Sequence, residues 1–222
     1  MVLIENNAER YSRQRDIVPP DRLERTRATV IGVGAIGRQV ALQLAAMGVP
    51  RLQLVDFDVV EIENLAPQGF LEKDLGQRKV EATAAFCLKI NNEIEIQVHD
   101  QRFRRSMEVG NTVFCCVDRI DTRRLIFEVV KDQVSFFVDG RMNAEVIRVL
   151  TVCAASGRAF YPQTLFRVEE AHTGPCTAKS TIYTANIAAG LMIAQFTKHL
   201  RSLPVDTDLQ VNLLTAELSV TQ

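Results

Sequence analysis

Three glycines and two acids between positions 28 and 58 have the types and spacing of a nucleotide-binding unit. An apolar run, 28–33, leads into Gly32, Gly34 and Gly37, and a second apolar run, 52–55, ends at Asp56 and Asp58. In such a strand–turn–helix–strand unit the glycines permit a tight turn and a close approach to phosphate, and the helix N-terminus attracts the anion. The acid that ends the second strand is placed for ribose hydroxyls. The segment therefore predicts a site for NAD, a flavin nucleotide or ATP.

The rest of the chain alternates segments with strand and helix patterns. Residues 112–117 form an apolar run typical of a buried parallel strand, and 94–98, 136–138 and 146–152 are further expected strands. Helical spacing marks 77–90, 121–130 and the small-residue segment 182–196, whereas 59–74 is expected to be irregular and 161–177 a loop. The pattern predicts an α/β fold with a Rossmann-like doubly wound, mostly parallel sheet and helices on both faces.

The carboxyl ends of the strands are where such a sheet binds its ligand. The glycine turn, Asp56, Asp58, Asp118 and Asp139 are all expected at these ends. Asp121 is expected to cap the helix that follows Asp118.

Composition and charge narrow the function classes. The 222-residue chain is 47% hydrophobic and 24% charged with a net charge of −1, which is typical of a globular protein and offers no signal for nucleic acid or membrane partners. Residues 1–16 lack the apolar core of a secretion signal, so a cytoplasmic location is expected. We expect an N-terminal arm over 1–27 and a single domain over 28–222.

Five cysteines and three histidines are scattered without a C-x-x-C pair. This pattern predicts free thiols and no structural zinc site.

Several motifs occur together and make the nucleotide site more specific. They are Arg10-Tyr11-Ser12-Arg13-Gln14, Asp56-Phe57-Asp58, Asn64-Leu65 followed by Gln68, Lys79 after Gly76-Gln77, and Cys116-Val117-Asp118 followed by Arg123. Over residues 10–200 the chain resembles the ThiF/MoeB/HesA family of E1-like activating enzymes. Members of this family adenylate the C-terminal glycine of a ubiquitin-like or sulfur-carrier protein. The resemblance implies that 28–222 is one ThiF-type adenylation domain that uses ATP and Mg²⁺.

The resemblance also assigns roles to the polar residues around the glycine turn. Asp56 would hold the ribose hydroxyls, Asp58 and Asn64 would lie beside the ribose and phosphates, and Gln68 would belong to the same nucleotide-binding set. Lys79 would neutralise phosphate charge during attack on the α-phosphorus. Taken singly, Asp58 also fits a turn residue, and Lys79 also fits a solvated lysine on a helix.

Two further roles follow from the same resemblance. Asp118 would bind Mg²⁺, which prefers one or two carboxylates with phosphate oxygens and water, although it also fits a helix cap. Arg13 would reach the ATP of the neighbouring protomer in a homodimer, although it also fits a surface arm. Arg123 matches a family position that is structural or near the site.

Two positions depart from the family pattern. Pro67 replaces an arginine that contacts the ATP phosphates in relatives, and Arg119 replaces an asparagine beside the expected metal ligand. Arg78 or an arginine of the arm is a possible substitute. A catalytically weakened, scaffold-only subunit is the alternative, but the retention of Lys79 and Asp118 argues against decay.

Cys176 lies in the loop before the small-residue helix, where ThiF-like members carry a cysteine that can join covalently to the carrier. A helix N-terminus nearby would lower the pKa of its thiol and favour the nucleophilic thiolate. The alternative is an ordinary loop cysteine.

We therefore expect ATP-dependent adenylation of the C-terminal carboxylate of a ubiquitin-like or sulfur-carrier protein, with transfer to Cys176 as the step that could follow if this cysteine is the nucleophile. Within the family, a peptide terminus or a carboxylate on a modified tRNA is an alternative acyl substrate, and the near-neutral charge gives no support to the tRNA. An NAD-dependent oxidoreductase would also use the glycine turn and Asp56, but it leaves Asp58, Asn64 and Lys79 unexplained.

Overall fold

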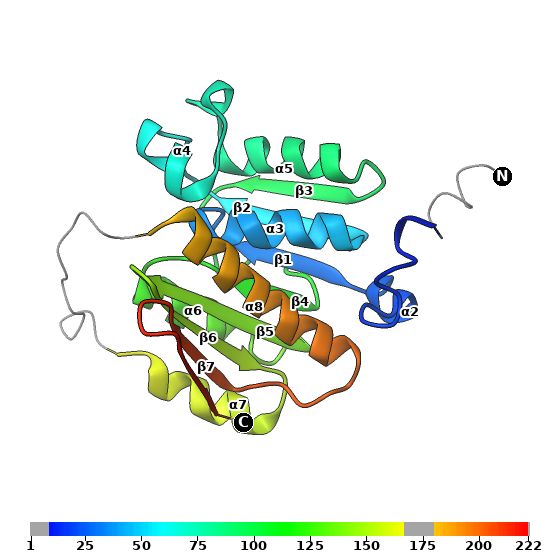
Figure 1. The fold of residues 1–222 in the computed structure, drawn as a ribbon, viewed down its shortest axis with the longest axis vertical. Coiled ribbons are helices and arrows are strands. Elements are labelled where there is room, and N and C mark those ends of the chain that lie inside the picture. Colours follow the sequence, from blue (N-terminus) through cyan, green and yellow to red (C-terminus); the bar gives the residue numbers. More distant parts are fainter. Residues whose placement is uncertain (1–8, 167–179, 222) are drawn as a thin grey trace.

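Eight strands form one mixed sheet in the order β3-β2-β1-β4-β5-β6-β7-β8 (Figure 1). The computed structural model describes residues 9–166 and 180–221 of the chain. Four pairings, from β3 through β5, are parallel, and the three from β5 through β8 are antiparallel. The strands are β1 (Arg27–Ile31), β2 (Arg51–Asp56), β3 (Glu95–Asp100), β4 (Thr112–Cys115), β5 (Phe136–Asn143), β6 (Val146–Val152), β7 (Asp208–Asn212) and β8 (Glu217–Thr221).

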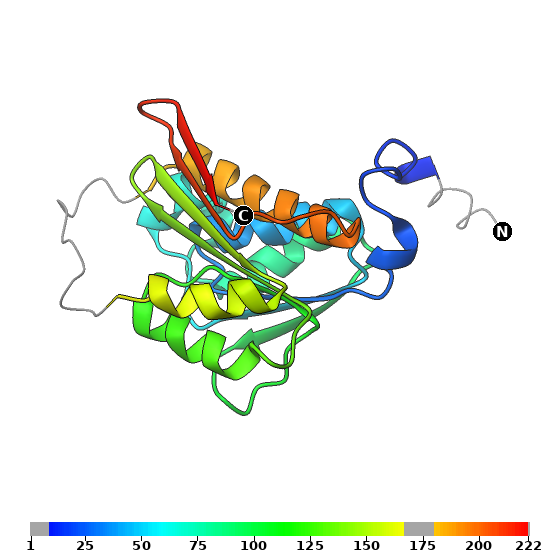
Figure 2. The same ribbon diagram turned by 90° about the horizontal axis from the view of Figure 1, so that it is seen from below.

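Helices cover both faces of this sheet. In Figures 1 and 2, α3, α5 and α8 lie on one face, and α6 and α7 lie on the other. The helices are α2 (Pro20–Leu23), α3 (Ala35–Met47), α4 (Ile62–Gln68), α5 (Lys79–Ile90), α6 (Ile120–Val130), α7 (Ala155–Phe160) and α8 (Ile182–Leu200), with 3₁₀ turns η1 (Glu72–Asp74) and η2 (Tyr161–Thr164). The predicted α/β architecture, doubly wound around a parallel core of strands, is confirmed.

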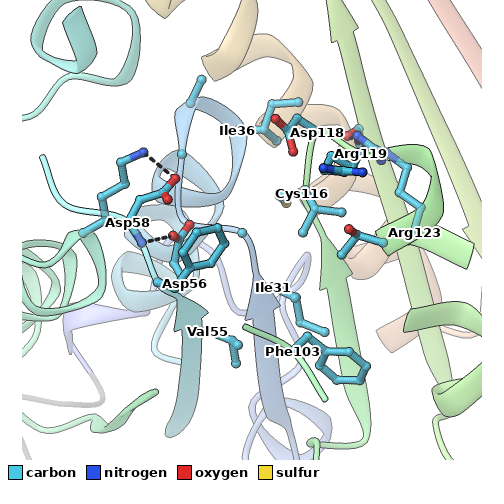
Figure 3. A pocket seen from close by; sticks show the side chains of 18 of the residues that line it. Ile31, Ile36, Val55, Asp56, Asp58, Phe103, Cys116, Asp118, Arg119 and Arg123 are labelled. Carbon is cyan, nitrogen blue, oxygen red and sulfur yellow. Dashed lines mark hydrogen bonds and ion pairs between the residues drawn. The ribbon is translucent and has the colours of Figure 1, made fainter. Parts of the chain in front are cut away.

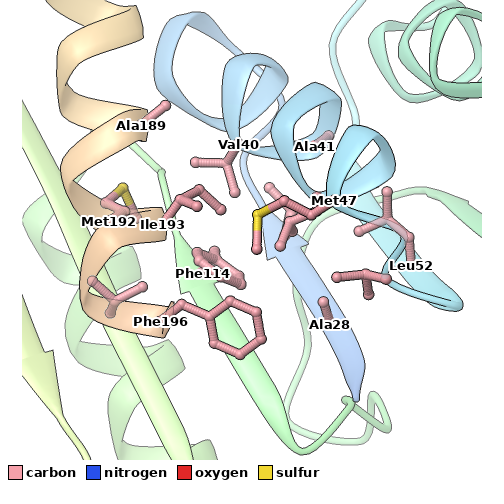
Figure 4. Close-up of a cluster of buried hydrophobic side chains, with 14 of the residues drawn as sticks. Ala28, Val40, Ala41, Met47, Leu52, Phe114, Ala189, Met192, Ile193 and Phe196 are labelled. Carbon is pink, nitrogen blue, oxygen red and sulfur yellow. The ribbon is translucent and has the colours of Figure 1, made fainter. Parts of the chain in front are cut away.

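The larger apolar core lies between α3, α8 and the central strands (Figure 4). Val40 on α3, Phe114 on β4 and Phe196 on α8 are each 1% exposed or less. Small residues on α8, among them Ala189, allow the close approach predicted for this helix. A Cβ on Gly140 of β5 would lie 2.4 Å from the Met192 sulfur of α8, so the sheet and this helix meet without room for a side chain at that point.

The N-terminal segment from residue 9 packs against the ends of α3 and α5. Gln14 Nε2 donates to the Met47 carbonyl at 2.8 Å, and Asn91 Nδ2 donates to Tyr11 Oη at 2.9 Å. The Tyr11 ring fills the space beside Gly48, the left-handed residue that ends α3. This segment therefore lies at the opposite end of α3 from the glycine turn.

Several local expectations are corrected. The segment 59–74 is not irregular, because it contains α4 and η1. Residues 161–164 form η2 rather than loop. The helix α6 begins at Ile120 with Arg119 as its N-cap, so Asp121 lies in the first turn and is not the cap. Asp139 does not end a strand, because β5 continues to Asn143.

None of the helices within residues 9–166 and 180–221 has the length and hydropathy of a membrane span.

Candidate active site

A cavity of about 820 Å³ lies at the carboxyl ends of β1, β2 and β4 (Figure 3). It contains the switch point of the sheet, since β1 pairs with β2 on one side and with β4 on the other. Glycines of the turn, acids after β2 and polar residues before α6 all contribute to its wall. The lining residues used below are Gly32, Gly34, Asp56, Phe57, Asp58, Gln68, Lys79, Arg102, Asp118, Arg119 and Arg123.

Glycine is required at two positions of the turn between β1 and α3. Gly32 has φ +87°, and its backbone N–H donates to the Val55 carbonyl of β2 at 2.9 Å. A Cβ on Gly37 would lie 1.8 Å from the Gly32 carbonyl oxygen, so no side chain fits where helix and strand cross. The nearest atom to a Cβ on Gly34 is Gln68 Oε1 at 3.8 Å. The turn is thus tight where it packs and open towards the cavity.

Asp56 is fixed by two backbone amides. The Val33 N–H donates to Oδ2 at 2.6 Å, and the Asp58 N–H donates to Oδ1 at 2.9 Å. Burial raises the pKa of Asp56, and these two hydrogen bonds act in the opposite direction. Each carboxylate oxygen keeps a lone pair, which suits a pair of ribose hydroxyls.

Lys79 is buried at the cavity wall and paired with Asp58. Its ammonium lies 3.2 Å from Asp58 Oδ2, and the side chains are 8% and 47% exposed respectively. The Lys79 backbone N–H also donates to the Asp58 carbonyl at 3.0 Å. Lys79 is therefore not a solvated lysine on the surface of α5. Its charge is held at the cavity by a partner that remains open to water.

Asp118 follows β4 and is exposed at the cavity mouth, beside Arg119 and Arg123 (Figure 3). Since Arg119 is the N-cap of α6 and no side chain caps that helix, Asp118 does not serve as the cap. Within the described part of the chain its carboxylate forms no ion pair. It is therefore free to take a cation.

A buried ion network behind Arg123 was not predicted from the sequence. Asp139 is fully buried on β5, where Arg123 pairs with its Oδ1 and Arg141 Nε lies 2.8 Å from its Oδ2. The Tyr161 hydroxyl donates to the same Oδ2 at 2.9 Å, and Arg123 Nη1 donates to the Gly140 carbonyl at 3.2 Å. The sequence feature that could have indicated this network is an acid, Asp139, inside the otherwise apolar run 136–140. The network fixes Arg123 at the cavity wall.

Of the residues of α4 expected at the nucleotide, one lines the cavity and another forms a hydrogen bond within its own helix end. Gln68 lines the cavity, and its Oε1 is buried without a hydrogen-bond partner among the described residues. Asn64 does not line it, because its Oδ1 accepts the Glu61 backbone N–H at 3.0 Å in a capping box. Pro67 lies in the last turn of this short helix. Gln68 Oε1 is therefore an acceptor that lies beside Gly34 and that no described residue occupies.

Arg13 and Cys176 are not brought to the cavity. Arg13 is exposed in the segment beside Met47, separated from Gly34 by the length of α3, about 20 Å for its 13 residues. Cys176 lies outside the described residues. Burial raises the pKa of Cys116, so this cavity-lining thiol is held protonated.

The lining residues suit a magnesium nucleotide. The backbone amides of an open glycine turn at a helix N-terminus and a buried ammonium are suited to phosphates, and the orphaned amide oxygen of Gln68 is suited to a hydroxyl or amino donor. Asp118 is an unpaired carboxylate of the type that holds Mg²⁺ together with phosphate oxygens. Arg102, stacked 3.8 Å above the Phe57 ring centroid, adds a cation at the mouth.

Curated relatives match the chain in part. Over 130 residues the chain is 36% identical to the adenylyltransferase and sulfurtransferase MOCS3 of Sus scrofa, covering 53% of this chain and 28% of that protein. Over 134 residues it is 34% identical to the SAMP-activating enzyme E1 of Haloferax volcanii, covering 55% of this chain and 50% of that protein. The chain thus spans half or less of the length of these relatives.

The fold matches a solved structure, and the sequence matches a family model. The crystal structure of E. coli MccB with AMPCPP and MccA superposes with a TM-score of 0.76 at 18% identity, covering 98% of this chain and 72% of that one. The model of the ThiF family matches residues 11–218. The Gly32–Gly37 turn, Lys79 and Asp118 all lie inside that match, and the chain belongs to the ThiF family.

Proposed function

We propose that the protein uses ATP to adenylate the C-terminal carboxylate of a ubiquitin-like or sulfur-carrier protein. The observation that carries this proposal is the buried Lys79–Asp58 pair at the wall of the glycine-turn cavity. Adenylation needs a fixed cation at the phosphates, whereas hydride transfer does not. The activity of the two curated relatives, an adenylyltransferase and an activating enzyme, points the same way.

The described residues would bind the nucleotide in one orientation. Asp56 accepts from the ribose hydroxyls, and the turn at Gly34 offers its amides to the phosphates. Lys79 Nζ would neutralise charge on the α-phosphate. Mg²⁺, held by Asp118, would offset charge on the departing phosphates. Asn64 lies beyond the cavity wall, so we assign it the role of holding α4 rather than of touching the nucleotide.

The proposed reaction is the transfer of an adenylyl group to the carrier. A carboxylate oxygen of the carrier attacks the α-phosphorus and forms a new P–O bond. The bond from the α-phosphorus to the oxygen bridging it to the β-phosphorus breaks, and that oxygen leaves with pyrophosphate. Lys79 and the helix N-terminus stabilise the charge that builds up during the transfer. The products are an acyl-adenylate and pyrophosphate.

Two parts of the proposal concern residues away from the cavity. The position of Arg13, about 20 Å from its own glycine turn, favours a homodimer. In this dimer the arm over 1–27 would complete the site in the partner's domain over 28–222.

Cys176 would then accept the acyl group as a thioester with release of AMP. Denaturing gels of a stalled reaction test this second part, since a reductant-sensitive adduct that persists in C176S would exclude it. The cytoplasmic location stays a prediction.

The test is ATP–pyrophosphate exchange with candidate proteins that end in Gly-Gly. Exchange that depends on the candidate, and that is lost in Asp118→Ala, is the expected result. A chain that binds no ATP in the presence of Mg²⁺ would contradict adenylation and support the scaffold alternative suggested by Pro67 and Arg119. Binding of NAD in place of ATP would support an oxidoreductase.

A peptide terminus is the second candidate substrate. It is favoured by the likeness to MccB, which was crystallised with MccA. The same exchange assay with short synthetic peptides separates the two substrate classes, because a globular carrier is then absent.

A further inference from the structure

Arg38 carries a buried guanidinium group that donates no hydrogen bond to the residues the structure describes. It lies in the second turn of α3, and the residue is 2% exposed. Its Nε and Nη2 atoms make no hydrogen bond to any described residue, and no carboxylate in the described chain lies within ion-pair distance. Burial lowers the pKa of Arg38, because the charged form is poorly solvated there. Unpaired buried charges are costly, so this one calls for an explanation.

Two aromatic rings account for part of its environment. The guanidinium carbon lies 4.8 Å from the Phe70 ring centroid and 5.1 Å from that of Phe86. The faces of these rings attract a cation, but they accept none of its N–H groups in the way that an oxygen would. A methionine would pack between the same rings without the cost of burying a charge. Packing alone therefore does not explain an arginine here.

The position of Arg38 connects it to the phosphate end of the cavity. Its backbone N–H donates to the Gly34 carbonyl at 3.0 Å, so the side chain starts one turn below the glycine turn. Its Nη1 lies 3.7 Å from where a Cβ on Gly69 would be, just past Gln68. Gln68 lines the cavity, and its own Oε1 is unpartnered beside Gly34. Arg38 thus lies next to two residues of the cavity lining, Gly34 and Gln68.

We propose that Arg38 is a positioning residue for the triphosphate: a cation buried behind the Gly34 turn that raises the affinity of the site for phosphates. The protein interior has a lower dielectric constant than water, so the charge of Arg38 is weakly screened there. This charge adds to the positive end of the α3 dipole. It also stacks on Phe70 and so orders the residues next to Gln68. The inference rests on the proposed function, because it requires that the cavity bind ATP.

The test compares the affinities of two ligands that differ in phosphate alone. Equilibrium binding of ATP and of adenosine is measured with Mg²⁺ at constant ionic strength for the wild type and for Arg38→Met, Arg38→Lys and Phe86→Leu. Arg38→Met removes the charge and keeps the bulk. Arg38→Lys keeps the charge. Phe86→Leu disturbs the stack and keeps the arginine, which makes it the control for a purely structural role.

We expect the preference for ATP over adenosine to fall about tenfold in Arg38→Met, and to be largely retained in Arg38→Lys and Phe86→Leu. Arg38→Met is expected to melt at or above the wild-type temperature, because a buried charge has been replaced by an apolar side chain. An unchanged preference in Arg38→Met, or an equal loss in Arg38→Lys, would overturn the inference. A lower melting temperature for Arg38→Met would overturn the claim that the charge is held at a cost to stability.

The same data separate this inference from the proposed function. A wild type that binds no ATP contradicts both. A wild type that binds ATP, with Arg38→Met binding it equally well relative to adenosine, contradicts only the role of Arg38.

Discussion

Lys79 Nζ lies 3.2 Å from Asp58 Oδ2, so the first residue of α5 is tied to the residue two positions beyond the end of β2. The lysine is buried and the aspartate is half exposed, which leaves the ammonium directed at the cavity rather than neutralised in the core. We expect Lys79→Met to lower the rate of ATP–pyrophosphate exchange about 100-fold or more, because a fixed charge at the phosphates is lost. Lys89→Met, at the exposed end of the same helix, is the matched control. Equal rates for the two variants would remove Lys79 from the mechanism.

A second prediction concerns the crossing of β1 and α3. The Cβ of Gly37→Ala would lie 1.8 Å from the Gly32 carbonyl oxygen, so the turn must shift. We expect a loss of about 3 kcal/mol or more in the free energy of unfolding, together with loss of nucleotide binding. Gly190→Ala in α8 meets no atom within 4 Å and should instead stabilise the protein by about 0.5–1 kcal/mol. Urea unfolding gives the free energy of unfolding of both variants. Similar free energies for Gly37→Ala and Gly190→Ala would show that the crossing of β1 and α3 is loosely packed.

The parallel half of the fold and the glycine turn could be predicted because their residues are buried in periodic patterns. The run 112–117 is apolar because β4 is covered on both faces, and Lys79 begins a helix whose apolar spacing is regular. By contrast, β8 is exposed along its whole length, so nothing in its composition distinguishes it from a loop. The helix α4 was missed because Pro67 lies inside it, although only in its last turn.

The site could be predicted where residues follow a strand, and not where charges are buried. Asp56 and Asp118 come directly after apolar runs, which places them at the sheet edge without further information. Asp139 is a buried charge whose partner Arg123 comes from another element, and Arg38 is buried against the rings of Phe70 and Phe86, which are distant in the sequence. A single sequence treats such residues as surface positions, because charge usually indicates exposure.

A third prediction uses the exposed position of Asp118. Since its carboxylate has no ion pair within the described residues, Asp118→Asn should change the free energy of unfolding by less than about 0.5 kcal/mol. Pyrophosphate exchange should nevertheless fall about 100-fold, and more Mg²⁺ should be needed to reach half of the maximal rate. Asp121→Asn, one turn further along α6, is the control and should retain both properties. Full activity of Asp118→Asn at low Mg²⁺ would exclude it as a metal ligand.

A fourth prediction tests whether Arg13 acts on a neighbouring chain. Arg13→Ala and Lys79→Met should each be nearly inactive alone. Mixed in equal amounts and allowed to exchange subunits, they should recover about a quarter of the wild-type rate, because half of the dimers are mixed and each has one intact site. No recovered activity, with mixed dimers shown to form by mass spectrometry, would mean that Arg13 does not act on the neighbouring chain. Full activity of Arg13→Ala alone would place Arg13 outside the site.

A fifth prediction concerns pH and stability away from the cavity. Burial opposes the charge on Asp206, but hydrogen bonds from Lys198 and Gln195, both 2.7 Å to Oδ2, outweigh it and lower the pKa of Asp206. A lowered pKa means that the carboxylate stabilises the fold above about pH 4 and that this contribution is lost as the pH falls through the folded-state pKa.

We therefore expect Asp206→Asn to lower the free energy of unfolding by about 1–2 kcal/mol at pH 7 and by less at pH 3. Chemical denaturation at both pH values gives the difference from the wild type, with the exposed Asp16→Asn as the reference variant. A difference that is the same at both pH values would mean that the charge of Asp206 is not what stabilises the fold.

The N-terminal segment packs at the far end of α3, and this position bears on how the protein behaves at different concentrations. Tyr11 and Gln14 fasten that segment beside Met47 and Gly48, so a chain cannot fold its own Arg13 back to its own glycine turn. If Arg13 serves a neighbour as proposed, specific activity would fall on dilution as the dimer dissociates. The amount of protein in the cell would then itself set whether its sites are complete.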